Sequence, residues 1–204
     1  MDGYLSFQEL KVHEVSGRDY VIEWRTGRSG LTLMALHGGG IEPGTSEVAR
    51  AVSKGVHAFY HFDGLKRKNN GVLHITSSRF DEPVALSLAA QSWKVITVHG
   101  CTNGGADLFV GGLDIELRSR CREVLYQAGF SIGNHPVFQG LQPENMCNRG
   151  RAGCGLQLEL SLNLRRRLFV SLNRWGRRYP TPIFHDLVHA LRQVLAMETV
   201  PRGF

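Results

Sequence analysis

The sequence lacks the features that would mark a membrane-anchored or exported chain. No stretch approaches the ~20 consecutive apolar residues that a membrane-spanning helix needs, so we expect no membrane contact. Residues 1–10 carry Asp2 and Glu9 in place of a basic region followed by an apolar run. We therefore expect no signal peptide and a cytoplasmic location.

Cysteine is also scarce, with four residues that form no C-x-x-C pair. A chain of 204 residues can bury a core without disulfide bonds, so reduced thiols are expected. A bridge between Cys147 and Cys154, in a glycine-rich segment, remains an alternative. No internal repeat, low-complexity tract or linker divides the chain, and its length predicts one domain spanning residues 1–204.

Positive charge is in excess, with a formal net charge of +6 and an isoelectric point near 9.4. This balance suits a polyanionic partner, either a nucleic acid or an acidic polymer. Six arginines gather towards the C-terminus, where they form either a solvated face or a contact surface. They are Arg165, Arg166, Arg167, Arg174, Arg177 and Arg178.

Runs typical of strands alternate along the chain with segments of helical periodicity. The predicted strands are 20–25, 31–36, 56–62, 73–76, 95–98 and 156–162. The predicted helices are 45–54, 83–91 with Asp81 as N-cap, 113–128 and 182–195. This alternation predicts a single α/β domain with a mixed, mostly parallel sheet flanked by helices.

Two histidines follow apolar strand runs, which is where ligands gather in an open α/β sheet. His37 follows 31–36, His99 follows 95–98, and Glu42 lies in the glycine-rich loop after His37. Two imidazoles and one carboxylate with an open fourth position are the ligands of a catalytic zinc site, so we predict Zn²⁺ on these residues. One alternative is that each histidine is only a hydrogen-bonded polar residue at a strand end. The other is that the glycine-rich loop binds a phosphate. The loop matches neither common phosphate-binding spacing, and Glu42 would repel a phosphate.

A zinc hydrolase needs a general base, and Glu159 is the candidate because it stands among leucines on a late strand. Glu47 and Glu116 are the next candidates. An anionic substrate needs positive groups, for which a guanidinium suits carboxylate geometry. The candidate substrate-binding residues beside the glycine-rich and strand-end segments are Arg79, Arg118, Arg149 and Arg165.

Two rival sites are weaker. His185 and His189 stand four residues apart on the last predicted helix, but the second position of their segment is Asp186 where a metalloprotease motif has glutamate. Cys101 lies two residues after His99, which is weak support for a cysteine nucleophile.

Five segments in order resemble the phage-type poly-γ-glutamate hydrolases and their bacterial relatives, from about residue 31 to 169. They are HGGGIEPGTSE at 37–47, LHITSSRFDEP at 73–83, VHG at 98–100, GGLDIELR at 111–118, and Asn148-Arg149 leading to QLE at 157–159. The resemblance implies a zinc carboxypeptidase-like fold, with His37, Glu42 and His99 as ligands and Glu159 as catalytic carboxylate.

The expected function is hydrolysis of γ-glutamyl amide bonds in poly-γ-glutamate by a monomer, with release by cell or phage lysis left open. The first alternative is a zinc amidohydrolase acting on another acidic peptide or on a cell-wall fragment. The second, less favoured alternative is a basic nucleic-acid-binding module, which predicts tight, steeply salt-dependent binding of DNA or RNA that persists without metal.

Overall fold

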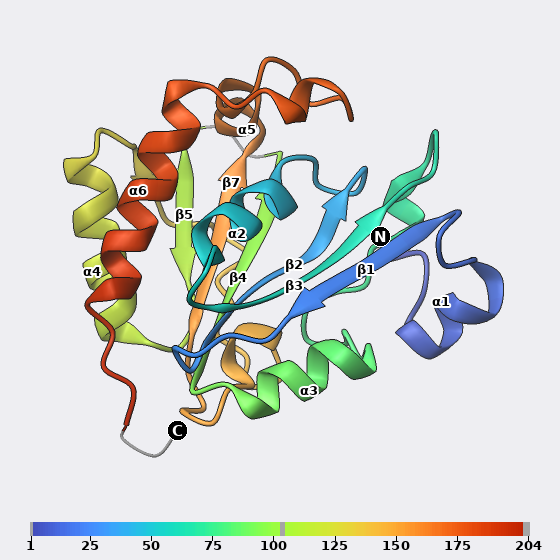
Figure 1. Ribbon diagram of the computed structural model, residues 1–204, viewed down its shortest axis with the longest axis horizontal. Coiled ribbons are helices and arrows are strands. Elements are labelled where there is room, and N and C mark those ends of the chain that lie inside the picture. Colours follow the sequence, from blue (N-terminus) through green and yellow to red (C-terminus); the bar gives the residue numbers. More distant parts are fainter. Residues whose placement is uncertain (1, 103–104, 202–204) are drawn as a thin grey trace.

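The computed structural model describes residues 2–102 and 105–201, and its strands form one seven-stranded sheet (Figure 1). The strands are β1 (Tyr20–Arg25), β2 (Leu31–Gly39), β3 (Ala58–Gly64), β4 (Lys94–Cys101), β5 (Leu108–Gly111), β6 (Ile132–Gly133) and β7 (Leu156–Ser161). Their spatial order is β1-β3-β2-β4-β7-β5-β6. Only the β1–β3 and β5–β7 pairs are antiparallel, so the predicted mixed, mostly parallel sheet is confirmed.

Helices cover both faces of this sheet (Figure 1). They are α1 (Phe7–His13), α2 (Thr45–Ser53), α3 (Pro83–Gln91), α4 (Ile115–Gln127), α5 (Leu162–Leu168) and α6 (Pro182–Ala196). Three short 3₁₀ turns are η1 (Asn70–Leu73), η2 (Met146–Asn148) and η3 (Gly176–Arg178). Among the described residues, no helix has both the length and the apolar character needed to cross a membrane.

Central strand β2 supplies both cores because successive side chains of a strand point to opposite faces. Leu33 and Ala35 pack in the first core, with residues of α2, α4, α5 and α6. Met34 and Leu36 pack in the second core, with residues of α1 and α3. A strand that is buried on both faces has a continuous apolar sequence, and this pattern allowed the strand at residues 31–36 to be predicted.

The second face is covered in two different ways. Helices α1 and α3 pack in the core beneath β1, β3 and β2. Over the β4–β7 part of this face lies the segment 134–149, anchored by the buried Met146 and by Asn145, whose Nδ2 donates to Gln157 Oε1 at 2.9 Å. Between the helices and this segment the sheet is open to a pocket.

Two sequence predictions are wrong. Residues 73–76 are not a strand, because Leu73 ends the 3₁₀ turn η1 and Ile75 is taken up in the second core. The N-cap of α3 is Glu82, whose carboxylate accepts from the Ala85 N–H, and not Asp81. The Asp81 carboxylate instead accepts from the Phe7 N–H and so holds the start of α1.

Elements α1, α5, β5 and β6 have no counterpart among the predicted elements. They have two to seven residues each, too few to show a periodic pattern. All four cysteines are free thiols, so the alternative bridge between Cys147 and Cys154 is not formed.

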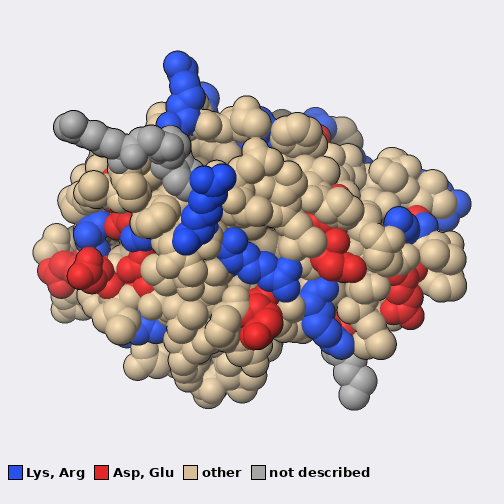
Figure 2. Space-filling view, turned by 90° about the horizontal axis from the view of Figure 1, so that it is seen from below, with Lys and Arg blue, Asp and Glu red and all other residues tan. Residues whose placement is uncertain are grey.

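The C-terminal arginine cluster is not a single solvated face. Arg165 is buried, Arg167 pairs with Asp107 at 2.7 Å, and Arg177 pairs with Glu47 at 2.6 Å. On the face that Figure 2 shows, basic and acidic side chains lie interspersed instead of forming one continuous basic surface. This distribution weakens the argument for an extended nucleic-acid contact on that face.

Candidate metal centre

His37 and His99 lie at the carboxyl ends of the neighbouring parallel strands β2 and β4, and both are almost fully buried. In a regular strand, His37 would point away from the face that Leu36 occupies. The register of β2 against β3 shifts between Ala35 and Gly38, and this irregularity lets both side chains reach the second face. The strand irregularity therefore aims the imidazole of His37 at His99.

The glycine-rich loop after His37 folds back tightly and returns Glu42 to the same place. The Glu42 N–H donates to the His37 carbonyl oxygen at 2.7 Å. Gly38 packs so closely that a Cβ atom there would lie 1.7 Å from Ser46 Oγ, and Gly39 has a φ of +63°. The glycines thus serve close packing and a left-handed turn.

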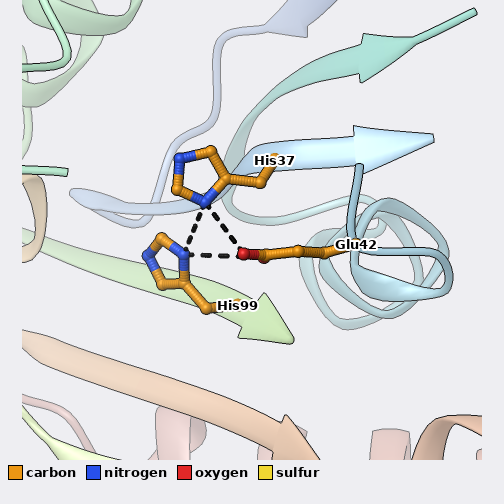
Figure 3. Close-up of side chains that lie close together, drawn as sticks. All are labelled: His37, Glu42 and His99. Atoms are coloured by element: carbon orange, nitrogen blue, oxygen red, sulfur yellow. Dashed lines mark hydrogen bonds and ion pairs between the residues drawn. The ribbon is translucent and has the colours of Figure 1, made fainter. Parts of the chain in front are cut away.

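The three side chains converge on one point (Figure 3). His37 Nδ1 lies 3.1 Å from His99 Nδ1 and 3.2 Å from Glu42 Oε1, and His99 Nδ1 lies 3.8 Å from Glu42 Oε2. Ligands about 2.0–2.1 Å from a tetrahedral zinc ion are roughly 3.3 Å apart. The cluster therefore has the spacing of a three-residue metal site, and among the described residues no other such group is found.

The remaining imidazole nitrogens have partners that orient both rings. His37 Nε2 donates to the Ile75 carbonyl oxygen at 2.8 Å, and His99 Nε2 lies 3.2 Å from Ser77 Oγ. A proton held on Nε2 leaves the Nδ1 lone pair free to bind a metal. The residues present thus fit a zinc ion in ligand type, spacing and tautomer.

Electrostatics favour a neutral His99 and an ionised Glu42, whereas His37 is drawn towards its protonated form. Burial disfavours a charge on His37, but the charge of Glu42 and its hydrogen bond outweigh burial and raise the His37 pKa, so a metal at this site would displace a proton from His37. Burial, opposed in part by the charge of Glu42, lowers the pKa of His99 to about 3, which keeps its imidazole neutral. Burial works against ionisation of Glu42, but the neighbouring His37, through charge and hydrogen bonding, lowers the Glu42 pKa to about 2. The Glu42 carboxylate also accepts the Gly100 N–H at 2.8 Å. Glu42 is therefore an ionised carboxylate held in a fixed position.

Glu159 stands beside this cluster, because it pairs directly with His99 across the β4–β7 ladder. Its side chain is almost fully buried, and Oε1 accepts from Gln157 Nε2 at 3.0 Å. Burial, and then the charge of Glu42, raise the pKa of Glu159 well above its ordinary value. A carboxyl group shifted in this direction holds a proton more readily than an ordinary glutamate does, which suits a group that takes a proton and later returns it.

The cluster opens into a pocket of about 410 Å³, which we call the site pocket. His37, Glu42, His99 and Glu159 form its floor, and the segment 136–142 forms one wall. The exposed ring of Phe138 stands in this wall. The pocket gives an extended ligand access to all four side chains.

The four predicted substrate-binding arginines are dispersed around the site. Arg79 pairs with Asp2 and lines a neighbouring pocket that shares Glu42 and His74 with the site pocket. Arg118 lies in another pocket beyond the 136–142 wall. None of the four arginines lines the site pocket itself.

The other two arginines mainly hold the backbone. The Arg149 guanidinium donates to the Ser78 and Glu144 carbonyl oxygens at 2.9 and 2.8 Å. Arg165 donates to the carbonyl oxygens of Pro43, Leu160 and Cys101 at 3.1, 3.2 and 3.1 Å. The buried Arg165 therefore fastens the loop of Glu42 to the ends of β4 and β7, and a substrate contact by either arginine stays a prediction.

His74 lies at the site but was not among the residues predicted from the sequence. Its ring stacks on His37 with centroids 3.9 Å apart, and its Nε2 lies 3.8 Å from Glu42 Oε1. Its Nδ1 lies 2.6 Å from Asp2 Oδ1. A single histidine within a segment predicted as a strand gave no indication of a site. It reaches the site only because residues 70–80 pass over the end of β2.

Neither rival site gains support. His185 and His189 lie exposed on α6, and the metal-site geometry includes neither of them. Cys101 is buried at the end of β4 and does not line the site pocket.

The fold and the site define the class of the protein, an α/β enzyme scaffold with a candidate metal centre at the carboxyl ends of its parallel strands. A family model described as poly-gamma-glutamate hydrolase matches residues 4–190. The chain therefore belongs to the poly-γ-glutamate hydrolase family and is a hydrolase.

Relatives and solved structures are similar to this chain over most of its length. The chain is 41% identical to YndL of Bacillus subtilis (strain 168) over 172 residues, covering 82% of this chain and 67% of YndL. It is 36% identical over 198 residues to the SPbeta prophage-derived YoqZ of the same organism, covering 95% of this chain and 72% of YoqZ.

The structure of a bacteriophage poly-gamma-glutamate hydrolase superposes with a TM-score of 0.92 at 31% identity, covering 96% of this chain and 97% of that one. The zinc-free form of YndL superposes with a TM-score of 0.91 at 36% identity, covering 97% and 98%.

Proposed function

We propose that this protein is a zinc-dependent amidohydrolase that cleaves the γ-glutamyl amide bonds of poly-γ-glutamate. The observation that carries the proposal is the convergence of His37 Nδ1, His99 Nδ1 and the Glu42 carboxylate beside Glu159 at the floor of one pocket. Two imidazoles and one carboxylate with an open position are the ligand set of hydrolytic zinc enzymes. Family membership supports the substrate.

Zinc held by these three residues would supply Lewis-acid polarisation of the scissile carbonyl group and of a water molecule. Glu159 takes the proton of the attacking water, and the same carboxyl group then gives a proton to the leaving amine. Its raised pKa suits the second step, because a carboxyl group with a raised pKa holds the proton more readily before passing it to the leaving amine. Gln157, which donates to Glu159 Oε1, holds the carboxyl group in place.

Positive side chains near the site bind the carboxylates of the substrate. Arg79 is placed for this role, because it lines the neighbouring pocket that shares Glu42 and His74 with the site pocket. Its charge is partly met by Asp2, so a substrate carboxylate would share the guanidinium with that residue.

Metal analysis of the purified protein tests the proposal. We expect about one zinc per chain by inductively coupled plasma spectrometry, and loss of that zinc in His37→Ala and His99→Ala. Poly-γ-glutamate and α-linked acidic peptides are then offered side by side to the zinc-loaded protein. Cleavage of the peptides alone would establish the alternative amidohydrolase, whereas a protein that takes up no transition metal would refute the metal site.

A nucleic-acid-binding module makes a different prediction. It would bind DNA or RNA tightly without metal, with an affinity that falls steeply as salt rises. We expect metal-free protein to show no such binding in a filter or gel assay.

A further inference from the structure

A second pocket of about 520 Å³ adjoins the site pocket on the far side of its wall. We call it the arginine pocket. It is lined by residues of β5, by Arg118, Ser119 and Arg122 of α4, and by part of the segment 134–139. Phe138 and Gln139 line both pockets, so the two pockets meet at this short segment.

Arg118 and Arg122 are half-buried here without an acidic partner. Each donates one hydrogen bond to a backbone carbonyl oxygen, Arg118 to Gly112 at 2.9 Å and Arg122 to Gly133 at 3.2 Å. Within the described residues, neither guanidinium has a carboxylate at ion-pair distance, and no aspartate or glutamate lines the pocket. Arg79, Arg167 and Arg177 around the same sheet each pair with a carboxylate.

The spacing of the two arginines suits a single anion. Residues four apart on a helix lie on the same side, so both guanidinium groups of α4 point towards one pocket. A planar guanidinium matches a carboxylate with two parallel hydrogen bonds. The pocket therefore has the chemistry of a carboxylate site that the protein itself leaves unfilled.

Poly-γ-glutamate presents such a carboxylate at every residue, because its backbone amide uses the γ-carboxyl group and leaves the α-carboxyl group free. We propose that Arg118 and Arg122 form a distal subsite that binds an α-carboxylate of a polymer residue several positions from the scissile bond. This inference rests on the proposed function and extends it. Short γ-linked oligomers would occupy the site pocket alone, so the subsite makes substrate affinity depend on chain length.

The test compares the zinc-loaded wild type with the double variant Arg118→Gln/Arg122→Gln on two substrates. One substrate is high-molecular-weight poly-γ-glutamate, and the other is the shortest γ-linked oligomer that the wild type still cleaves. For the polymer we expect KM to rise roughly fivefold to tenfold with kcat nearly unchanged, because a screened charge-assisted contact is lost. The KM for the oligomer should not change.

A matched control removes the same charge elsewhere. Lys11 and Lys54 are exposed and line none of the described pockets, so Lys11→Gln/Lys54→Gln should leave both KM values unchanged. If loss of the Arg118 bond to Gly112 unfolds the double variant, Arg122→Gln alone should still raise the polymer KM by about threefold.

Three results would overturn the subsite: an unchanged polymer KM in the arginine variants, an equal rise for the short oligomer, or an equal rise in the lysine control. Failure of the proposed function is distinct, because then the wild type itself would cleave no γ-linked glutamate of any length, and the subsite would fall with it.

Discussion

Two clusters of charged side chains in this protein show what separates a structural site from a functional one. Near the amino ends of the strands, Lys94 contacts Asp114 and Glu198 at 2.6 Å each, and Arg120 contacts Glu198 at 2.5 Å. Two cations meet two anions, so this cluster needs nothing from outside.

The cluster at the carboxyl ends is composed differently. Glu42 and Glu159 bring two carboxyl groups together, and the guanidinium of the nearby Arg165 is occupied by backbone carbonyl oxygens. The imidazole of His99 is neutral, and the cationic partner of Glu42 is His37, whose pKa the charge of Glu42 raises against the effect of burial. A metal ion between His37, Glu42 and His99 would replace the proton of His37, and this exchangeable charge distinguishes the cluster from a structural ion-pair network.

The largest expected effect concerns Glu159. The variant Glu159→Gln keeps the shape of the side chain but cannot accept a proton, so kcat on poly-γ-glutamate should fall by roughly 10² to 10⁴. Zinc content, the unfolding temperature and KM should stay close to the wild type. A kcat near the wild-type value would remove Glu159 from the mechanism, and loss of zinc would make Glu159 a ligand.

Metal binding should raise the free energy of unfolding of the wild type but not of a variant that lacks a metal ligand. Zinc at about 100 times its dissociation constant adds about 2.7 kcal/mol to the free energy of unfolding. For a chain of this size, that corresponds to a rise of roughly 5–10 °C in the unfolding temperature, measured by calorimetry after chelation and zinc return. His37→Ala should abolish the rise, and an equal rise in that variant would place the metal elsewhere.

Breaking the ion-pair cluster around Lys94 should lower stability without affecting metal binding or activity. Lys94→Met leaves Asp114 and Glu198 with less positive charge in a largely buried place, and should lower the free energy of unfolding by roughly 2–3 kcal/mol. Zinc content and kcat should not change. Chemical denaturation measures the effect, with the exposed Lys11→Met as control. A Lys94→Met protein as stable as that control would show that the ion pairs contribute no net stability.

The smallest effect is the pH dependence of the same cluster. Burial opposes ionisation of Asp114, but hydrogen bonds from Lys94 and the Leu117 N–H outweigh it, and the folded pKa lies below 3.8. Because the folded pKa is lowered, this stabilisation is present above the unfolded value and is lost as pH falls through the folded one.

Stability of the wild type should therefore decline below about pH 4, and the Lys94→Met protein should show a weaker decline. Denaturation curves at several pH values below 5 measure both slopes. Parallel declines in the two proteins would assign the acid sensitivity to other carboxyl groups.

Much of the site was predictable because its residues follow strand ends. His37 and His99 each come directly after an apolar run, and parallel neighbouring strands bring their carboxyl ends together. Glu159 was recognisable as a carboxylate among leucines on a strand. Residues 73–76 misled the prediction, because a short apolar run in a loop that packs against the core resembles a strand.

The sequence by itself determined the fold class and the chemical types of the site residues, because periodicity and glycine spacing are local properties of the chain. Tertiary structure alone decided what each arginine contacts. Arg149 and Arg165 donate to carbonyl oxygens of distant segments, and Arg79 meets Asp2, whereas Arg118 and Arg122 face a pocket without an acidic residue. The partners of a long charged side chain are set by residues far away in sequence, and no local pattern records them.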